Sequence, residues 1–435
     1  MSSMNRQILR LSVPNIISNI TVPLLGLVDL AMMGHLNNPV YIGAIALGSA
    51  IFNVIYMSFG FLRMSTSGFT AQAFGGKQKT ESSLILYRSL FVAFAFALLL
   101  LLLQYPIQWV SFRLLDGSEE VKTLARQYFY IRIFAAPATL ALYALYGWFL
   151  GMQNARIPMI LSITINILNI GLNFLFIRGF HMTSNGVALA SVIAQYSGLL
   201  LAIYFLVRQY KDYLRKFSTA VILQAKSLKK FFRVNADIFI RTLLLILVLT
   251  FFTSRSAHIS DEILAVNSLL FQFFFIFSYF ADGFAFAGEA LTGKAKGEGD
   301  EVLLKKTVQH LFYWGWGAAV AFCFVYFFGM KALMWVMTDN EVLTLRAFDY
   351  KWGVIILPLT SSAAFIWDGI YIGVTASRAM RNTMIVASLL VFLPAYYLTE
   401  SSYANHGLWF ALNLFMVSRG LLMWMISKKA VYNSS

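Results

Sequence analysis

Long apolar runs dominate this 435-residue chain and limit what it can fold into. Hydrophobic residues make up 59% of the sequence, whereas soluble domains usually have roughly 45–50%. A water-soluble fold cannot bury that much apolar surface, and disordered chains are polar, so both classes are excluded. An α-helix crosses a bilayer with roughly 20 apolar residues. The composition therefore predicts an all-α integral membrane protein.

Twelve apolar runs follow one another along the chain, separated by short polar segments. They use nearly the whole length and leave no room for a separate soluble domain. The longest interruption, 208–232, holds seven lysines and arginines. We therefore predict an N-terminal six-helix bundle at 1–207, a basic cytoplasmic linker at 208–232 and a C-terminal six-helix bundle at 233–435. The runs are 10–33, 41–66, 84–110, 126–150, 157–177, 186–207, 233–256, 262–290, 307–330, 343–374, 382–399 and 405–427.

The positive charge is spread unevenly over the predicted loops. The net charge is +15, and with the N-terminus inside, the cytoplasmic segments hold 22 Lys and Arg residues against 8 on the other side. Cytoplasmic loops of membrane proteins are enriched in these residues. The charge therefore predicts that both termini are cytoplasmic, and it does not call for a nucleic-acid partner. The single cysteine, Cys323, cannot form a disulfide within the chain.

Two short motifs recur in the second half of the chain at nearly the same offset. Ala71-Gln-Ala-Phe-Gly-Gly76 resembles Gly288-Glu-Ala-Leu-Thr-Gly293, and Gly147-Trp-Phe-Leu-Gly151 resembles Gly369-Ile-Tyr-Ile-Gly373. The offsets are 217 and 222 residues, and the order is kept. Because each half holds six spans, an even number, both halves enter the membrane in the same direction. The sequence predicts two bundles related by a pseudo-two-fold axis along the membrane normal.

Five carboxylates fall within the predicted spans, where a charged side chain costs roughly 2.5–3.5 kcal/mol even on the lenient insertion scale. Such groups must face protein or water, so each is a candidate for function. The alternative for each is a carboxylate that is paired or that reaches the interface from a helix end. The five are Asp29, Asp237, Asp282, Glu289 and Asp368.

Asp29 ends the stretch Thr21-Val-Pro23-Leu-Leu-Gly26-Leu-Val-Asp29. Desolvation among Leu and Val disfavours the charged form of a carboxylate, which suits a group that takes up and releases a proton. Pro23 removes one backbone hydrogen bond from the helix, which can therefore bend there. We expect Asp29 to couple protonation to movement, with Pro23 as the hinge.

Amide side chains gather in the fifth and sixth spans. Asn166, Asn169 and Asn173 are spaced by three and four residues, so they share one helical face. Ser191 and Gln195 are likewise one turn apart in the next span. Polar faces of this kind often only hold membrane helices together. Since they lie in the same half as Asp29, we favour a shared polar cavity.

The second half has its own set of candidates. Asp237 and Arg241 are spaced i, i+4, which leaves two alternatives: the two charges neutralise each other, or they take part in function. Asp282 and Glu289 are seven residues apart on one helical face, with Glu289 near the cytoplasmic end and close to Lys294. Asp368 lies in the apolar setting Ile366-Trp-Asp-Gly-Ile-Tyr. We take Asp282 and Asp368 as the main candidates.

No pattern predicts an enzyme, a metal centre or a bound cofactor. The five histidines fall mostly in loops or at span ends, without metal-ligand spacing. The run Gly75-Gly76-Lys77 lacks the spacing and the preceding strand of a P-loop, which argues against an ATP-driven pump. No nucleophile and base stand out as a pair, so we expect a transporter without catalytic residues.

The motifs around these candidates resemble those of one transporter family. The stretch from Ser18 to Asp29 strongly resembles multidrug and toxic compound extrusion (MATE) transporters, and more narrowly their DinF-like branch. Further matches are Arg63-Met-Ser-Thr66, Asn235-x-Asp237-Ile-x-x-Arg241, Asp282-Gly-Phe-Ala285 with Glu289, and Asp368-Gly-x-x-Ile372-Gly373. The similarity extends in order over all twelve spans.

The resemblance implies a V-shaped antiporter of two six-helix bundles, in which inward flow of H⁺ or Na⁺ drives export of cationic or amphipathic compounds by alternating access. The family's first-helix acid maps to Asp29, and its amino-half ion site maps to Asn169, Asn173 and Ser191. Many relatives have Asp where this chain has Asn173, and Thr where it has Ser191. Since Na⁺ favours anionic oxygen ligands, we favour H⁺, with Na⁺ at these four residues as the alternative.

The resemblance also implies a monomer in the plasma membrane, which for a bacterium is the inner membrane, with small drugs as substrates. Its carboxyl-half acids map to Asp282 and Asp368. Three other functions stay open, and the first of them, a channel, is disfavoured by the two-lobed repeat. A lipid-linked oligosaccharide flippase of the same superfamily would need a strongly basic cavity, whereas the spans hold only four arginines: Arg63, Arg132, Arg241 and Arg419. An integral-membrane transferase would need a cluster of catalytic acids or histidines at one face, and the sequence shows none.

Overall fold

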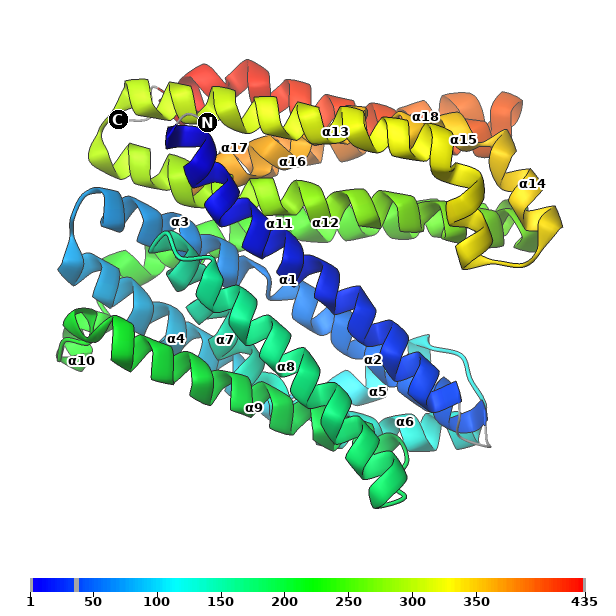
Figure 1. Cartoon of the computed structure of the whole chain (residues 1–435), viewed down its shortest axis with the longest axis horizontal. Helices are drawn as coiled ribbons and strands as arrows, with labels where there is room; N and C mark the ends of the chain where they lie inside the picture. Colours follow the sequence, from blue (N-terminus) through cyan, green and yellow to red (C-terminus); the bar gives the residue numbers. More distant parts are fainter. Residues whose placement is uncertain (1–2, 35–38, 433–435) are drawn as a thin grey trace. The chain divides into compact units, whose positions relative to one another are not determined.

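The computed structural model of the protein describes residues 3–34 and 39–432, with their side chains except those of residues 22, 24–34 and 39. The described residues form helices and connecting turns, without a β-strand (Figure 1). This confirms the predicted all-α fold. The first half contains α1 (Ser3–Gly34), α2 (Pro39–Ser58), α3 (Phe61–Gly75), α4 (Lys79–Leu102), α5 (Gln104–Leu114), α6 (Glu119–Arg132), η1 (Ile133–Ala135), α7 (Ala136–Gly151), α8 (Arg156–Phe174), η2 (Leu175–Gly179) and α9 (Ser184–Gln209).

The central segment and the second half continue in the same way. Short segments separate most of the helices, and η2, η4 and η5 are single turns of π-helix, whereas η1 and η3 are 3₁₀ turns. The elements are η3 (Lys211–Tyr213), α10 (Thr219–Ile222), α11 (Ala225–Ile259), α12 (Asp261–Glu298), α13 (Glu301–Met337), α14 (Glu341–Asp349), α15 (Lys351–Ile355), α16 (Leu357–Gly373), α17 (Ser377–Val386), η4 (Ala387–Phe392), α18 (Leu393–Ser427) and η5 (Lys428–Tyr432).

The twelve predicted spans correspond to these helices taken singly or in consecutive groups. Ten helical stretches of the described residues are long and apolar enough to cross a membrane. One of them, Ser377–Tyr432, contains two predicted spans, because Ala404 interrupts α18 with a φ of 42°. Helix α1 supplies the first span. Where a span consists of several helices, as in α6, η1 and α7, a short irregular turn lies inside it.

Polar caps mark several of the helix starts. Ser118 begins α6 by accepting a hydrogen bond from the backbone of Val121, and Ser260 does the same for α12. Asp300 and Asn340 cap α13 and α14. A cap of this kind satisfies an amide that would otherwise lack a partner at the first helical turn. Short polar segments between apolar runs are therefore enough to end one helix and begin the next.

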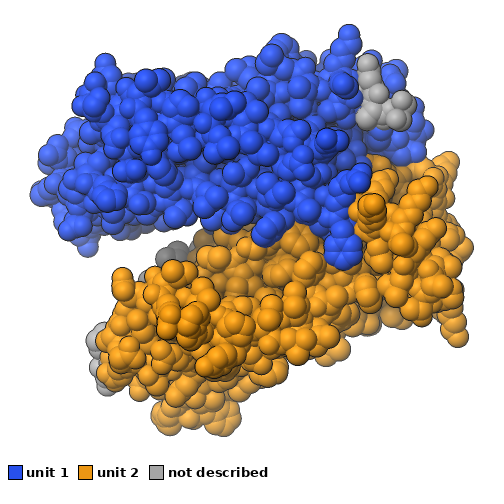
Figure 2. Space-filling view, turned by 180° about the vertical axis from the view of Figure 1, so that it is seen from behind, with its two compact units in different colours: residues 1–16, 232–435 blue, residues 17–231 orange. Residues whose placement is uncertain are grey.

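The chain forms two compact units, coloured separately in Figure 2. Residues 17–231 form the N-terminal unit, and residues 1–16 with 232–435 form the C-terminal unit. The start of α1 therefore packs with the second half of the chain. Trp314 donates a hydrogen bond to Asn5 at 3.3 Å, and Gly283 lies against Ile16. The division proposed from the sequence had grouped residues 1–207 together.

The basic central segment folds onto the N-terminal unit. Arg88 of α4 donates a hydrogen bond to the carbonyl oxygen of Ile222 at 3.2 Å, at the end of α10. Trp148 of α7 packs against Tyr210 and Tyr213, with ring centroids 5.0 and 5.8 Å apart. An aromatic cluster and a buried arginine therefore hold the segment between the two sets of spans in place.

One of the two predicted repeat motifs, the pair beginning at Gly147 and Gly369, plays the same part in both units. A Cβ atom at Gly147 of α7 would lie 2.2 Å from the carbonyl oxygen of Arg63 in α3. A Cβ atom at Gly369 of α16 would lie 2.1 Å from the carbonyl oxygen of Ala285 in α12. Gly147 and Gly369 lie 222 positions apart in the sequence, and so do Arg63 and Ala285. Such contacts require glycine, because only the absence of a side chain lets two helix backbones approach so closely.

A second glycine one turn later repeats the contact. Gly151 faces the carbonyl oxygen of Ser67 and Gly373 faces that of Glu289, where a Cβ atom would lie at 2.8 and 2.6 Å. Gly151 and Gly373 are again 222 residues apart, and so are Ser67 and Glu289. Each unit is therefore built around one close crossing of the same type, α3 with α7 and α12 with α16. The internal repeat seen in the sequence has a structural counterpart.

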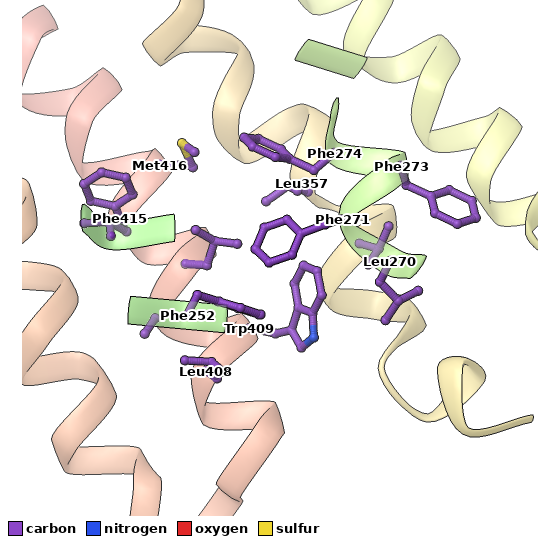
Figure 3. Close-up of a cluster of buried hydrophobic side chains, with 14 of the residues drawn as sticks. Phe252, Leu270, Phe271, Phe273, Phe274, Leu357, Leu408, Trp409, Phe415 and Met416 are labelled. Atoms are coloured by element: carbon purple, nitrogen blue, oxygen red, sulfur yellow. The ribbon is translucent and has the colours of Figure 1, made fainter. Parts of the chain in front are cut away.

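Aromatic side chains fill the core of the C-terminal unit (Figure 3). Phe252 of α11 packs edge-on against Phe271 of α12 and Trp409 of α18, with ring centroids 4.7 and 5.0 Å apart. The indole of Trp409 donates a hydrogen bond to Asn267 at 2.9 Å, and Asn267 and Asn405 bond each other through both side-chain amides. Asn405 directly follows the break at Ala404, so this buried amide pair links the interrupted helix α18 to α12.

We predict that Gly369→Ala destabilises the protein by about 1–3 kcal/mol, because the new methyl group forces α12 and α16 apart. The measurement is urea-induced unfolding of the purified full-length protein in detergent micelles. Gly317→Ala in α13 is the matched control, since a Cβ atom there meets nothing within 4 Å. Equal stability of the two variants would contradict the close crossing.

Candidate functional site

The predicted amide cluster forms a continuous hydrogen-bonded chain inside the N-terminal unit. Asn173 donates to Asn169 at 3.0 Å, and Asn169 donates to Ser191 at 2.9 Å. The first two residues are one turn apart on α8, and Ser191 lies opposite them on α9. All three side chains are buried, with exposed fractions of 6% or less. The spacing of three and four residues in the sequence therefore led to the right partners.

The amide chain carries no formal charge. Its oxygen atoms belong to two carboxamides and one hydroxyl, and an amide N–H is the donor in both hydrogen bonds of the chain. Such oxygens can accept hydrogen bonds or weakly coordinate a cation. A site for a hard cation usually includes at least one carboxylate among its oxygen ligands. The three residues therefore form a buried polar group without a carboxylate of their own.

Asp29 lies in helix α1, six residues after Pro23. The structure describes its backbone but not its side chain. Helix α1 runs through Pro23 without an interruption in its assignment. Just before the proline, the Thr21 hydroxyl donates to the carbonyl oxygen of Ser18 at 2.7 Å. Proline cannot donate to the carbonyl group four residues earlier, so this turn of the helix has fewer backbone hydrogen bonds than its neighbours.

Asp368 joins two arginines in the interior of the C-terminal unit. Its Oδ2 atom accepts hydrogen bonds from Arg241 of α11 and from Arg419 of α18, the latter at 2.6 Å. The three residues are 5%, 6% and 2% exposed. Three helices, α11, α16 and α18, are thereby linked at one carboxylate oxygen. We call this group the Arg–Asp–Arg cluster.

The structure contradicts one of the two alternatives for Asp237 and Arg241, their pairing with each other. Asp237 accepts hydrogen bonds from Arg381 at 2.6 Å and from Ser377 at 2.9 Å, both on α17. Arg241 instead extends to Asp368. Although the i, i+4 spacing places the two groups on one side of α11, each finds a buried partner on another helix. The two residues therefore link α11 to two different neighbouring helices.

The remaining two acids lie on α12. The charge of Asp282 acts on Arg419, so this carboxylate lies near the Arg–Asp–Arg cluster. Glu289 is 1% exposed, and its backbone carbonyl packs against Gly373. Lys294, expected near Glu289, forms an ion pair with Glu298 at 3.7 Å. Asp368 binds Arg419 directly and Asp282 lies in the same region, whereas Glu289 lies at the close helix crossing.

Two residues of these clusters were not among the sequence candidates. Arg419 is completely surrounded by protein, and its Nη1 atom also contacts the sulfur of Met416 at 3.2 Å. Arg381 is one of the 22 Lys and Arg residues predicted to lie on the cytoplasmic side. A usable signal existed for Arg419, since an arginine within an apolar run requires an acidic partner in the membrane. No comparable signal marked Arg381, which lies close to the end of a span.

Comparison with known proteins gives a consistent result. The family model described as MatE matches residues 14–175 and 238–397. The chain is 37% identical over 423 residues to "DNA damage-inducible protein F" of Escherichia coli (strain K12), covering 97% of this chain and 91% of that protein. It is 32% identical over 211 residues to "Multidrug and toxin extrusion protein 1" of Homo sapiens, covering 46% of this chain and 35% of that protein.

Solved structures share the fold. A structure described as the outward-facing conformation of a multidrug resistance MATE family transporter superposes with a TM-score of 0.88 at 19% identity, covering 98% of this chain and 96% of that one. A mutant of the Vibrio cholerae MATE transporter VcmN superposes with a TM-score of 0.87 at 19% identity, covering 100% of this chain and 98% of that one. The predicted twelve-helix arrangement agrees with these structures.

We predict that Asp368→Asn lowers the free energy of unfolding by about 3–5 kcal/mol, because it leaves two buried guanidinium groups without their carboxylate. Urea-induced unfolding in detergent micelles measures the loss. The matched control is Glu262→Gln, which breaks the exposed ion pair with Arg346 and should lower the stability far less, because solvent screens that pair. Similar losses for the two variants would show that Asp368 does not hold the cluster together.

Proposed function

Because this chain belongs to the MATE family, we propose that it exports cationic or amphipathic small molecules across the plasma membrane in exchange for protons. One observation carries the choice of the proton. The chain Asn173–Asn169–Ser191 has only neutral oxygen atoms, at the position where the family's resemblance places an ion site. Na⁺ would have to bind without the second carboxylate that many relatives have there. A proton needs only one titratable group, and Asp29 is the candidate.

The membrane setting follows from the helices and the relatives together. The chain is a multi-pass membrane protein, with long apolar helices throughout its length. The excess of Lys and Arg on one side supports cytoplasmic termini. A monomer in the inner membrane of a bacterium is the arrangement that this proposal assumes. Transport is driven by the ion gradient, so the proposal requires no cofactor and no covalent chemistry.

In the proposed cycle, Asp29 takes up a proton from the outside and releases it to the cytoplasm. Protonation removes the cost of keeping a charge among apolar side chains and favours a bent α1. Pro23 is the turn at which this bend costs least, because one backbone hydrogen bond is already missing there. Bending closes the cavity of the N-terminal unit and expels the substrate. Loss of the proton restores the first state.

The C-terminal unit has a different part in this proposal. Asp368 already bonds two arginines, so a change in its protonation would disrupt three helices at once. Asp282 is therefore the better second-half candidate for ion or substrate contact. The same pairing weakens the flippase alternative, since Arg241 and Arg419 share a carboxylate and do not supply free positive charge for a pyrophosphate group.

We predict that Asp29→Asn abolishes efflux driven by a pH gradient, because the amide cannot carry a proton through the cycle. The measurement uses proteoliposomes containing the full chain and the ethyl ester of rhodamine B, a cationic dye, with and without Na⁺. The wild-type protein should export the dye on a pH gradient alone. Asp116→Asn, which changes an exposed acid in a loop, is the control and should transport normally.

Two outcomes would contradict the proposal. Dye efflux that requires Na⁺ would move coupling to a cation site that includes the Asn173–Asn169–Ser191 chain. Full activity of Asp29→Asn on the pH gradient would remove Asp29 from the coupling step altogether.

A further inference from the structure

The basic central segment carries its cations on the outside of the N-terminal unit. All seven are exposed, and none of them forms an ion pair with a carboxylate of the described residues. Exposed cations elsewhere do have such partners, as Arg346 has Glu262 at 3.0 Å. We call the seven residues the basic surface: Arg208, Lys211, Arg215, Lys216, Lys226, Lys229 and Lys230.

Contacts with α4 hold the first part of the basic surface in place. Arg215 donates a hydrogen bond to the Thr80 hydroxyl at 3.2 Å. Phe217, which follows Lys216, packs edge-on against Tyr87 with ring centroids 5.9 Å apart. The short helix α10 comes next and lies at one end of the unit, as Figure 1 shows. The cations therefore stand on a folded segment, so that little further conformational entropy is lost when a partner binds.

The first two turns of α11 have one basic face. Lys226, Lys229 and Lys230 are spaced by three and four residues, so they lie on the same side of the helix. Phe231 lies on another side, where it is 4% exposed and stacks on Phe69 of α3 with ring centroids 5.8 Å apart. The apolar side of this helix start is thus used for packing within the unit, and its basic side is left open.

The three lysines weaken the helix that carries them. Like charges three or four residues apart repel each other on a helix surface. Cations in the first turns also oppose the helix macrodipole, whose positive end lies there. Because no carboxylate of the described residues pairs with these lysines, nothing in that part of the chain compensates for either effect. Their position therefore calls for anions from outside the chain.

Helix α11 is longer than a bilayer requires. Its 35 residues span about 52 Å at 1.5 Å per residue. The hydrocarbon core of a bilayer is only about 30 Å thick. The apolar run of this helix begins at residue 233, so residues 225–232 precede the hydrocarbon core. The basic face of α11 therefore lies at the level of the lipid headgroups, where acidic phospholipids attract lysine and arginine.

We propose that the basic surface binds the phosphate groups of acidic phospholipids, with Lys226, Lys229 and Lys230 as its main contacts. Each lysine ammonium group donates hydrogen bonds to phosphate oxygens, and the seven cations together attract several headgroups. Phosphatidylcholine carries the same phosphate, but its choline group cancels the negative charge. The surface therefore prefers acidic lipids to neutral ones. The inference goes beyond the export proposal, because lipid binding requires neither a substrate nor an ion gradient.

The test measures lipid binding to the purified full-length protein by native mass spectrometry, which counts bound lipids by their mass. The protein is titrated in a neutral detergent with phosphatidylglycerol or with phosphatidylcholine of the same acyl chains. The wild-type protein should bind phosphatidylglycerol more tightly. The triple variant Lys226→Gln/Lys229→Gln/Lys230→Gln should raise the Kd for phosphatidylglycerol at least about tenfold and leave that for phosphatidylcholine unchanged.

The matched control is Lys305→Gln/Lys306→Gln/Lys331→Gln, which changes three exposed lysines of α13. It removes the same net charge but leaves the basic surface intact, so its Kd values should equal those of the wild type. An unchanged midpoint of urea-induced unfolding checks that the triple variant of α11 is folded. A second measurement needs no variant: raising the ammonium acetate concentration should weaken the binding of phosphatidylglycerol to the wild type, because salt screens exposed charges.

Equal affinity of the wild type for the two lipids, or equal losses in the α11 variant and the α13 control, would overturn this inference. Competition by soluble glycerol 1-phosphate at the concentration of the lipid would also overturn it, because the surface would then bind free phosphate groups and not a membrane. Failure of the export proposal looks different, since the dye would not move on a pH gradient while phosphatidylglycerol would still bind. The two ideas can therefore fail separately.

Discussion

The absence of water in a bilayer governs this structure from the backbone upward. An amide or a charge within the hydrocarbon core must find its partner inside the protein. An α-helix pairs its backbone N–H and C=O groups with one another, which explains why the described residues contain no strand. The side chains meet the same demand through links between helices, such as Asn169 to Ser191 and Asp368 to its two arginines. Polar groups that would be scattered over the surface of a soluble protein are therefore concentrated at a few buried positions.

Packing without a hydrophobic driving force adds a second demand, for close contact between helix backbones. The chain meets it with one arrangement used twice, at Gly147 and at Gly369, 222 residues apart. The residues around the two crossings have diverged. Arg63 lies at the first and Ala285 at the second, so equal backbone geometry supports different chemistry in each unit.

The spacing of residues along the sequence predicted much of this organisation. It did not predict which distant residues pair with one another. Span positions, the repeat and the amides of α8 follow from periodicity, because residues three or four apart on a helix must share a face. Arg241 shows the limit. Its spacing from Asp237 allowed a contact, yet both residues bond groups more than 120 positions away. Which of several nearby helices supplies a partner depends on how the helices pack, and a single sequence does not encode that visibly.

The division of α1 between the units has a consequence for how the chain can be cut. A fragment that begins at the central segment contains every span of the second half but lacks residues 3–16, which cover Gly283 and bond Trp314. The two repeats are thus not interchangeable modules. Helix α1 belongs partly to each unit, because its first residues group with the second half of the chain. Co-expressed halves would need the break placed within α1, or the first sixteen residues appended to the second piece.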